Sequence, residues 1–296
     1  MTATVEKPAL RHRLAERGID RVLLLLLPGV VFAVALFLYP FLYGLQLSFA
    51  PKSGGVFSNY SRFFSDPYLR NTIWTTLGIA LPATFVNVLA SIPIAYVMRG
   101  KMRGKRLMTT ILVVPITLGT VLTAQGLIMY TGQLGWLNKV LMSTGLIDAP
   151  LTLIHNYAGV LLSLIITGFP FSFLLTLSYL SGIDPTLERA AATLGANWGQ
   201  RFRRITLPLL APGLAITFCL SFVMAFSVFP SAQLVGDPAG ATRVISIAAY
   251  HAAFEEYDYS MGSAVAMIMA VLMLLIIGLV MTWRATLYRG ATGGKG

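Results

Sequence analysis

Six long stretches of this chain contain no Asp, Glu, Lys or Arg, and they decide its fold class. They cover approximately residues 22–47, 71–98, 107–130, 157–180, 209–229 and 260–283. An α-helix needs about 20 apolar residues to cross roughly 30 Å of hydrocarbon, and each stretch provides them. Because helices satisfy their own backbone hydrogen bonds in lipid, we predict an all-α membrane protein with six transmembrane helices.

The composition supports this prediction. Of the 296 residues, 56% are hydrophobic and only 11% are charged, whereas a soluble domain carries roughly 25% charged residues. Soluble, fibrous, disordered and disulfide-rich classes are therefore excluded. Cys219 is the only cysteine in the sequence, which rules out an intrachain disulfide and a cysteine-based metal cluster.

The first apolar stretch follows several arginines, so a secretory signal peptide has to be considered. Its apolar run is longer than the 7 to 15 residues of a signal peptide and no convincing cleavage site follows. We interpret it as a retained helix. Pro82, Pro93 and Pro170 lie inside later stretches, where neighbouring helices can compensate for the lost backbone bond.

Charge placement predicts the orientation in the membrane. With a cytoplasmic N-terminus, the inside segments hold 17 Lys and Arg residues and the outside segments hold five, a strong positive-inside bias. We predict cytoplasmic termini, N-in and C-in, with segment 1–21, a single transmembrane domain at 22–283 and a tail at 284–296. This topology explains the basic loop at 99–106 without nucleic-acid binding.

The chain lacks the residues of catalysis and of ion coupling. No Asp, Glu, Lys, Arg or His lies within the six stretches, although such groups mark proton relays. The sequence contains no H-E-x-x-H, no G-x-S-x-G and no phosphate-binding G-x-x-x-x-G-K-[ST]. We therefore expect a non-enzymatic protein that takes any energy for transport from another polypeptide.

The predicted cytoplasmic loop 181–208 has the pattern of two short helices joined by a bend. Asp184 is a good N-cap before Pro185, and the first helix should run to about Leu194. Gly195 permits a sharp exit. Asn197 and Gln200 resemble a capping box that starts a second helix, and Pro208 can open the fifth transmembrane helix. One apolar stripe is expected on the first helix, at Leu187, Ala190, Ala191 and Leu194.

Two interpretations of this loop follow from its residues alone. Its stripe of small side chains suits close docking by a partner protein. Its second helix carries Trp198, Phe202 and Ile205 among Arg201, Arg203 and Arg204, which also suits an interfacial segment lying on anionic lipid.

Residues 189–208, RAAATLGANWGQRFRRITLP, resemble the EAA loop of bacterial ABC-importer permeases. The pattern is E-A-A, three residues, Gly, nine residues, then I-x-L-P, and six of its seven fixed positions match. The resemblance implies a coupling helix that contacts an ATPase subunit. On this basis the predicted coupling residues are Glu188, Arg189, Ala190, Ala191, Leu194, Gly195, Arg201, Leu207 and Pro208.

The sequence departs from the pattern at its first position, where Arg189 stands in place of Glu. Glu188 lies one residue earlier, which turns a side chain by about 100° on a helix. Either Glu188 replaces the usual glutamate from a rotated position, or the ATPase partner has changed its charge.

The resemblance also implies partners and a location. We expect a second homologous permease subunit, two ATP-binding subunits that hold ATP and Mg, a periplasmic or extracellular solute-binding protein, and lipid of the bacterial inner membrane. No cofactor is expected in this chain. A stand-alone channel or facilitator is the alternative function, and a membrane enzyme or scaffold is a weaker one.

The sequence indicates the type of transporter more clearly than the solute that it carries. Leu194-Gly195-Ala196 differs from the D-G-A of sugar permeases and resembles the spermidine/putrescine branch, as does the segment 241–264. A polyamine or similar cation is therefore expected, with phosphonate, iron, opine or sugar as alternatives. The acidic last outer loop, which contains Asp237, Glu255, Glu256 and Asp258, would favour a cation, although acidic residues also scatter freely over such loops.

Uncharged polar and aromatic residues within the stretches are candidates for a solute pathway, since aromatic faces hold amines through cation–π attraction. Ordinary helix packing uses the same residue types. The candidates are Asn87, Gln125, Phe169, Phe173 and Phe226.

Overall fold

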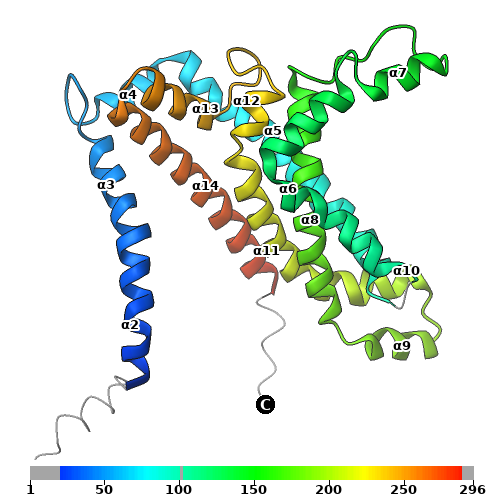
Figure 1. Cartoon of the computed structure of the whole chain (residues 1–296). Helices are drawn as coiled ribbons and strands as arrows, with labels where there is room; N and C mark the ends of the chain where they lie inside the picture. Colours follow the sequence, from blue (N-terminus) through cyan, green and yellow to red (C-terminus); the bar gives the residue numbers. More distant parts are fainter. Residues whose placement is uncertain (1–20, 101–102, 289–296) are drawn as a thin grey trace, which may run out of the picture.

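The computed structural model describes residues 21–100 and 103–288, and this part of the chain consists of helices and connecting loops (Figure 1). Six helical spans are long and apolar enough to cross a membrane, which confirms the predicted fold class. Segment 1–21 lies outside the described residues except for Arg21, as do residues 101–102 and the tail beyond 288.

The spans agree closely with the predicted stretches. The first is one run of α2 (Arg21–Ala33), the π-helical turn η1 (Val34–Leu38) and α3 (Tyr39–Ser48). The remaining five are α5 (Pro67–Met98), α6 (Lys105–Thr131), α8 (Tyr157–Ser181), α11 (Leu207–Phe226) with the helical turns before it, and α14 (Tyr259–Tyr288).

Shorter helices fill the connections. The predicted loop helix is α9 (Pro185–Thr193). Four more short helices and a π-helical turn are not anticipated from the apolar pattern: α4 (Ser58–Ser65), α7 (Trp136–Ser143), α12 (Pro230–Leu234), α13 (Ile245–Tyr250) and η3 (His251–Glu255).

The fifth span begins earlier than predicted. It is continuous from α10 (Trp198–Arg201) through the π-helical turn η2 (Phe202–Thr206) into α11, and Pro208 lies inside it rather than at its start. A proline ring clashes with the carbonyl four residues earlier in a regular α-helix. The wider turn of η2, where the Leu207 amide reaches back to Phe202 O, removes this conflict. The span also ends at Phe226, short of the predicted 229.

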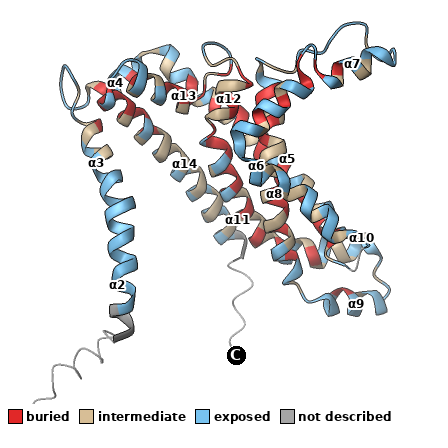
Figure 2. Ribbon diagram, in the orientation of Figure 1, coloured by how far each residue is buried: buried red, intermediate tan, exposed pale blue. Residues whose placement is uncertain are grey.

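Helices α5, α8 and α11 form the centre of the molecule, where the buried residues are concentrated (Figure 2). The main core also takes in α13 and the first part of α14, through Ile245 and Val265. A second cluster joins the lower ends of α5, α8 and α11 around Met98, Phe173 and Leu210. The three central helices therefore form a packed unit that ends beside α9.

The first span stands apart from this unit (Figures 1 and 2). Its side chains from Leu25 to Tyr43 are exposed, for example Leu25 (80%) and Phe37 (71%), and burial begins only after Tyr43. The end at α3 adjoins α4 and α14. Most of its apolar surface is thus open to lipid or to another subunit.

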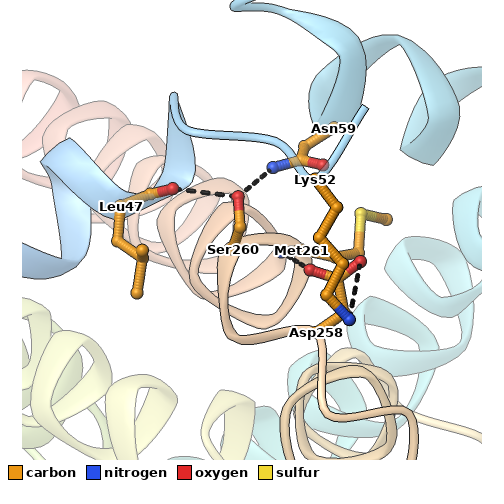
Figure 3. A network of polar contacts seen from close by, with 6 residues as sticks. All are labelled: Leu47, Lys52, Asn59, Asp258, Ser260 and Met261. Atoms are coloured by element: carbon orange, nitrogen blue, oxygen red, sulfur yellow. Dashed lines mark hydrogen bonds and ion pairs between the residues drawn. The ribbon is translucent and has the colours of Figure 1, made fainter. Parts of the chain in front are cut away.

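A polar network fastens α3 to the rest of the bundle (Figure 3). Asn59 of α4 is buried, and its Nδ2 donates to Ser48 O at 3.1 Å and to Ser260 Oγ at 2.6 Å. Ser260 donates in turn to Leu47 O at 3.0 Å. Beside them Asp258 accepts from the Met261 amide and lies 4.0 Å from Lys52 Nζ.

We predict that Asn59→Ala loosens the first span. The change leaves buried polar groups without partners, which costs about 1–3 kcal/mol. The thermal unfolding midpoint of the purified protein should fall, and proteolysis between α3 and α4 should accelerate. Ser61→Ala, at an exposed position of the same helix, is the control. Equal midpoints and cleavage rates for the two variants would contradict the role of this network.

Candidate functional site

The loop 181–208 folds into a bent unit, here called the elbow, made of α9, the turn at 194–197, α10 and η2. Asp184 Oδ1 accepts from the Thr186 amide at 2.8 Å, so the predicted N-cap is present. Hydrogen bonding to the side chain of Thr186, together with this bond to its amide, lowers the pKa of the exposed Asp184 carboxyl. The negative charge at the start of α9 also favours the helix dipole.

The turn of the elbow follows the predicted geometry. Gly195 has a φ of +86°, a left-handed conformation in which a β-carbon is strained. Asn197 and Gln200 then exchange hydrogen bonds of 2.9 Å, each side chain with the other's amide, and form the predicted capping box. The bend is thus fixed by local chemistry on both sides.

Glu188 clamps the first arm of the elbow to the end of α5. Its side chain is 7% exposed, and its Oε2 lies 2.5 Å from Arg99 Nη2 and accepts from the Tyr96 hydroxyl at 3.0 Å. Its Oε1 accepts from the Thr206 hydroxyl. One carboxylate therefore joins α9, α5 and η2.

The electrostatics of this clamp favour the ionised carboxylate. Burial by itself raises the pKa of Glu188, but hydrogen bonds from Arg99, Thr206 and Tyr96, together with the Arg99 charge, outweigh burial and hold the pKa below its ordinary value of about 4.5. Charge-assisted hydrogen bonds of this kind are stronger than neutral ones.

Aromatic side chains clamp the second arm. The Tyr96 ring meets the edges of Trp198 and Phe202 at centroid distances of 5.8 and 5.2 Å, and these two rings stack on each other at 5.9 Å. The Arg99 guanidinium lies 4.4 Å from the centre of the Tyr96 ring. Both arms of the elbow therefore hold the same end of α5.

The residues that the structure describes leave the outward face of α9 uncovered. Ala190 and Arg189 are exposed, and Leu187 and Leu194 are 46% and 88% exposed. Ala191 is half-buried on the inner side, so the predicted apolar stripe is divided between the two faces. The predicted coupling residues Arg201 and Leu207 are half-buried, and Gly195 and Pro208 are exposed.

A cavity of about 330 Å³ lies between the spans, away from the elbow. It is bounded by α5, α6, α8, α11 and the turn at 227–230. Among the described residues that line it, none is ionisable. The polar and aromatic members of this lining are Asn87, Thr120, Thr167, Phe171, Ser221, Ser227 and Phe229.

Asn87 is the most unusual of these residues. Its side chain is 2% exposed, its Nδ2 donates to Leu164 O at 3.2 Å, and its Oδ1 has no hydrogen-bond partner among the described residues. Gly168 makes room for it, because a β-carbon there would lie 2.5 Å from Asn87 Nδ2. An unpartnered buried carbonyl is costly, so this oxygen is suited to receive a hydrogen-bond donor.

Helix α6 is broken where it meets the cavity. Gly119 has a φ of 74° and a ψ of 175° inside the helix, a conformation essentially restricted to glycine. In membranes, irregular backbone is tolerated where it is buried or lines a cavity. The break at Gly119 therefore marks the same region as Asn87.

The other predicted pathway residues lie elsewhere in the structure. Gln125 is exposed on α6 and Phe169 is half-buried. Phe173 and Phe226 are fully buried in the packing of α5, α8 and α11. Of the five candidates, the cavity lining includes Asn87.

The partners of Glu188 were missed by the sequence analysis. Arg99 was interpreted only as part of the basic loop, and Tyr96 and Thr206 carried no distinguishing pattern. Arg99 and Glu188 are 89 positions apart, so no local spacing connects them. The burial of a charged residue in an otherwise exposed helix is visible only once the chain is folded.

We predict that Glu188→Gln destabilises the elbow by about 2 kcal/mol, because it leaves the Arg99 guanidinium without a counter-charge. Faster proteolysis within 181–208 and a lower unfolding midpoint should report this. Glu256→Gln, at an exposed carboxylate, is the matched control. Identical behaviour of the two variants would show that the clamp contributes nothing.

The lowered pKa gives this test a pH dependence. A carboxyl whose pKa is lower in the folded state stabilises that state above its unfolded pKa. The contribution of Glu188 is therefore complete at neutral pH and lost as the pH falls below about 4.5 through the folded value. The Gln variant should lack this step.

Comparisons with known proteins agree with this architecture. Residues 9–289 match the family described as binding-protein-dependent transport system inner membrane component. The spermidine/putrescine permease PotB of Haemophilus influenzae is 30% identical over 261 residues, covering 84% of this chain and 90% of the relative. A probable sulfate permease, cysT of Prototheca wickerhamii, is 30% identical over 74% of this chain and 85% of its own.

A solved structure shares the fold. A bacterial alginate ABC transporter in complex with a periplasmic protein has a chain that superposes with a TM-score of 0.76 at 21% identity, covering 96% of this chain and 98% of that chain. The match to the family extends over nearly the whole sequence. This multi-pass membrane protein belongs to the family of inner-membrane permease components of binding-protein-dependent ABC transport systems.

Proposed function

We propose that this permease couples solute import to a separate ATP-binding subunit through the elbow. The observation that carries the proposal is the two-sided character of α9. Its inner side is fixed to α5 by Glu188, while Ala190 and Leu194 on its outer side are exposed. A helix that is held on one side and uncovered on the other is suited to receive a partner and pass on its movement.

The proposed mechanism is mechanical. Closure of the ATP-binding subunits would displace α9, and the contacts of Glu188 and Tyr96 would transfer the displacement to α5 and, through η2, to α11. These helices line the cavity that contains Asn87. Coupling requires that solute contacts differ between the conformations on either side of this movement.

The proposed assembly contains two permease subunits, two ATP-binding subunits that hold ATP and Mg, and a solute-binding protein at the face opposite the elbow. The exposed apolar surface of the first span supports a second permease subunit and surrounding lipid as its neighbours. The distribution of Lys and Arg supports an elbow on the cytoplasmic side. The proposed location of the assembly is the bacterial inner membrane.

We propose a polyamine or similar organic cation as the cargo. The support is the spermidine/putrescine relative and the aromatic, uncharged cavity, whose faces can hold an amine by cation–π attraction of about 0.5–2 kcal/mol. The acidic loop adds little. Glu255 pairs with His251 at 2.7 Å and Asp258 lies 4.0 Å from Lys52. A similarly related permease carries the name of an anion, sulfate, instead.

We predict that Gly195→Val lowers ATP-driven uptake by at least tenfold and leaves the affinity of the binding protein for solute unchanged. A β-branched residue is strongly disfavoured at a φ of +86°. Gly195→Asn is the matched control, since Asn tolerates this conformation, and it should retain uptake. Normal uptake by the Val variant in whole cells would contradict the role of the elbow.

We also predict that Asn87→Leu reduces the maximal uptake rate, because the cavity loses its unpartnered carbonyl. Thr84→Val, one turn away on α5 and bonded within its own helix at 2.7 Å, should have less effect. Uptake of radiolabelled spermidine in proteoliposomes distinguishes the two variants. Equal rates for Asn87→Leu and the wild type would exclude Asn87 from the pathway.

A further inference from the structure

The elbow carries two neighbouring residues of opposite charge, and the structure uses them differently. Both carboxylate oxygens of Glu188 are occupied within the chain, Oε2 by Arg99 and Tyr96 and Oε1 by Thr206. With only 7% of its surface exposed, Glu188 is enclosed by these groups and is scarcely accessible to a partner protein. It acts as an internal clamp.

Arg189 points away from this clamp. On a helix it lies about 100° from Glu188 and about 160° from the half-buried Ala191. It is exposed, and none of the ion pairs formed by the described residues includes it. Its neighbours on the outer surface, Ala190 and Thr193, are exposed as well. Arg189 is therefore the charged residue on the uncovered face of α9.

The surroundings of Arg189 are predominantly positive. The loop 181–208 contains four arginines and two acidic residues, and one of the two is the enclosed Glu188. Asp184 is exposed, but its Oδ1 already caps α9. A protein that covers this face has to supply its own negative charge, because an unpaired guanidinium is costly to desolvate.

We infer that Arg189, rather than Glu188, is the charged contact that α9 offers to the ATP-binding subunit, and that the groove receiving α9 carries a carboxylate opposite Arg189. The inference rests on the proposed function. It resolves the departure at the motif's first position in favour of a changed charge on the partner. An arginine can bind a carboxylate through two parallel hydrogen bonds, so the contact also fixes the orientation of α9 in the groove.

The test measures how tightly the ATP-binding subunit of the same importer binds the permease in nanodiscs. Arg189→Glu should weaken binding by tenfold or more and flatten its salt dependence, whereas Arg189→Lys should stay within about threefold. Exchanging one groove carboxylate for Arg should restore binding to Arg189→Glu. Arg106→Glu, a charge reversal at an exposed position near the start of α6, is the control, and its affinity should stay within twofold of the wild type.

The outcomes separate the inference from the proposed function. If Arg189→Glu binds the ATP-binding subunit with an affinity within twofold of the wild type, the inference is overturned and the proposed function stands. If Arg189→Glu and Arg106→Glu lose affinity equally, and the loss varies with the anionic lipid content of the nanodisc, Arg189 contacts lipid. That result would also overturn the inference. A wild-type permease that binds no ATP-binding subunit would overturn the proposed function itself. An unchanged unfolding midpoint confirms that each variant is folded.

Discussion

The ion pair between Glu188 and Arg99 determines what the elbow can do. Without it, α9 would be a short amphipathic helix that this carboxylate does not join to α5, and a displacement of α9 by a partner would not be transmitted to α5 through this contact. With it, α9 is joined to the end of α5 at 2.5 Å and, through Thr206, to the helix that continues into α11. A buried pair of this kind contributes little net stability compared with apolar packing, so its value lies in fixing one geometry.

In the proposed mechanism, the surface that receives force is separate from the cavity that contacts solute. Charged residues cluster at the elbow, where Glu188 acts inward and Arg189 outward. The cavity near Asn87 and the break at Gly119 has no ionisable residue among the described residues that line it. Such a division suits a family whose relatives carry names as different as spermidine and sulfate permease, because the cavity can change while the elbow is retained.

The sequence predicted the parts of the structure that depend on local chemistry. The spans follow from uncharged runs, and the bend follows from Asp184, Gly195 and the Asn197–Gln200 capping box. Features that depend on residues distant in the chain were not predictable. Arg99 finds Glu188 across 89 positions, and Phe173 and Phe226 are committed to helix packing rather than to a cavity. The position of Pro208 predicts the start of a helix, but the π-helical turn before it lets the helix continue through the proline.

The most direct test of the account is a distance measurement between α9 and α5 during the ATP cycle. Spin labels at Ala192, beside the docking face of α9, and Val97, both exposed, would be placed in a chain whose Cys219 is replaced by Ala, within the assembled importer in nanodiscs. If the elbow and α5 move as one body, a single narrow distance should persist with and without ATP. A distance that changes with ATP while uptake continues would show that force reaches the membrane helices by another route.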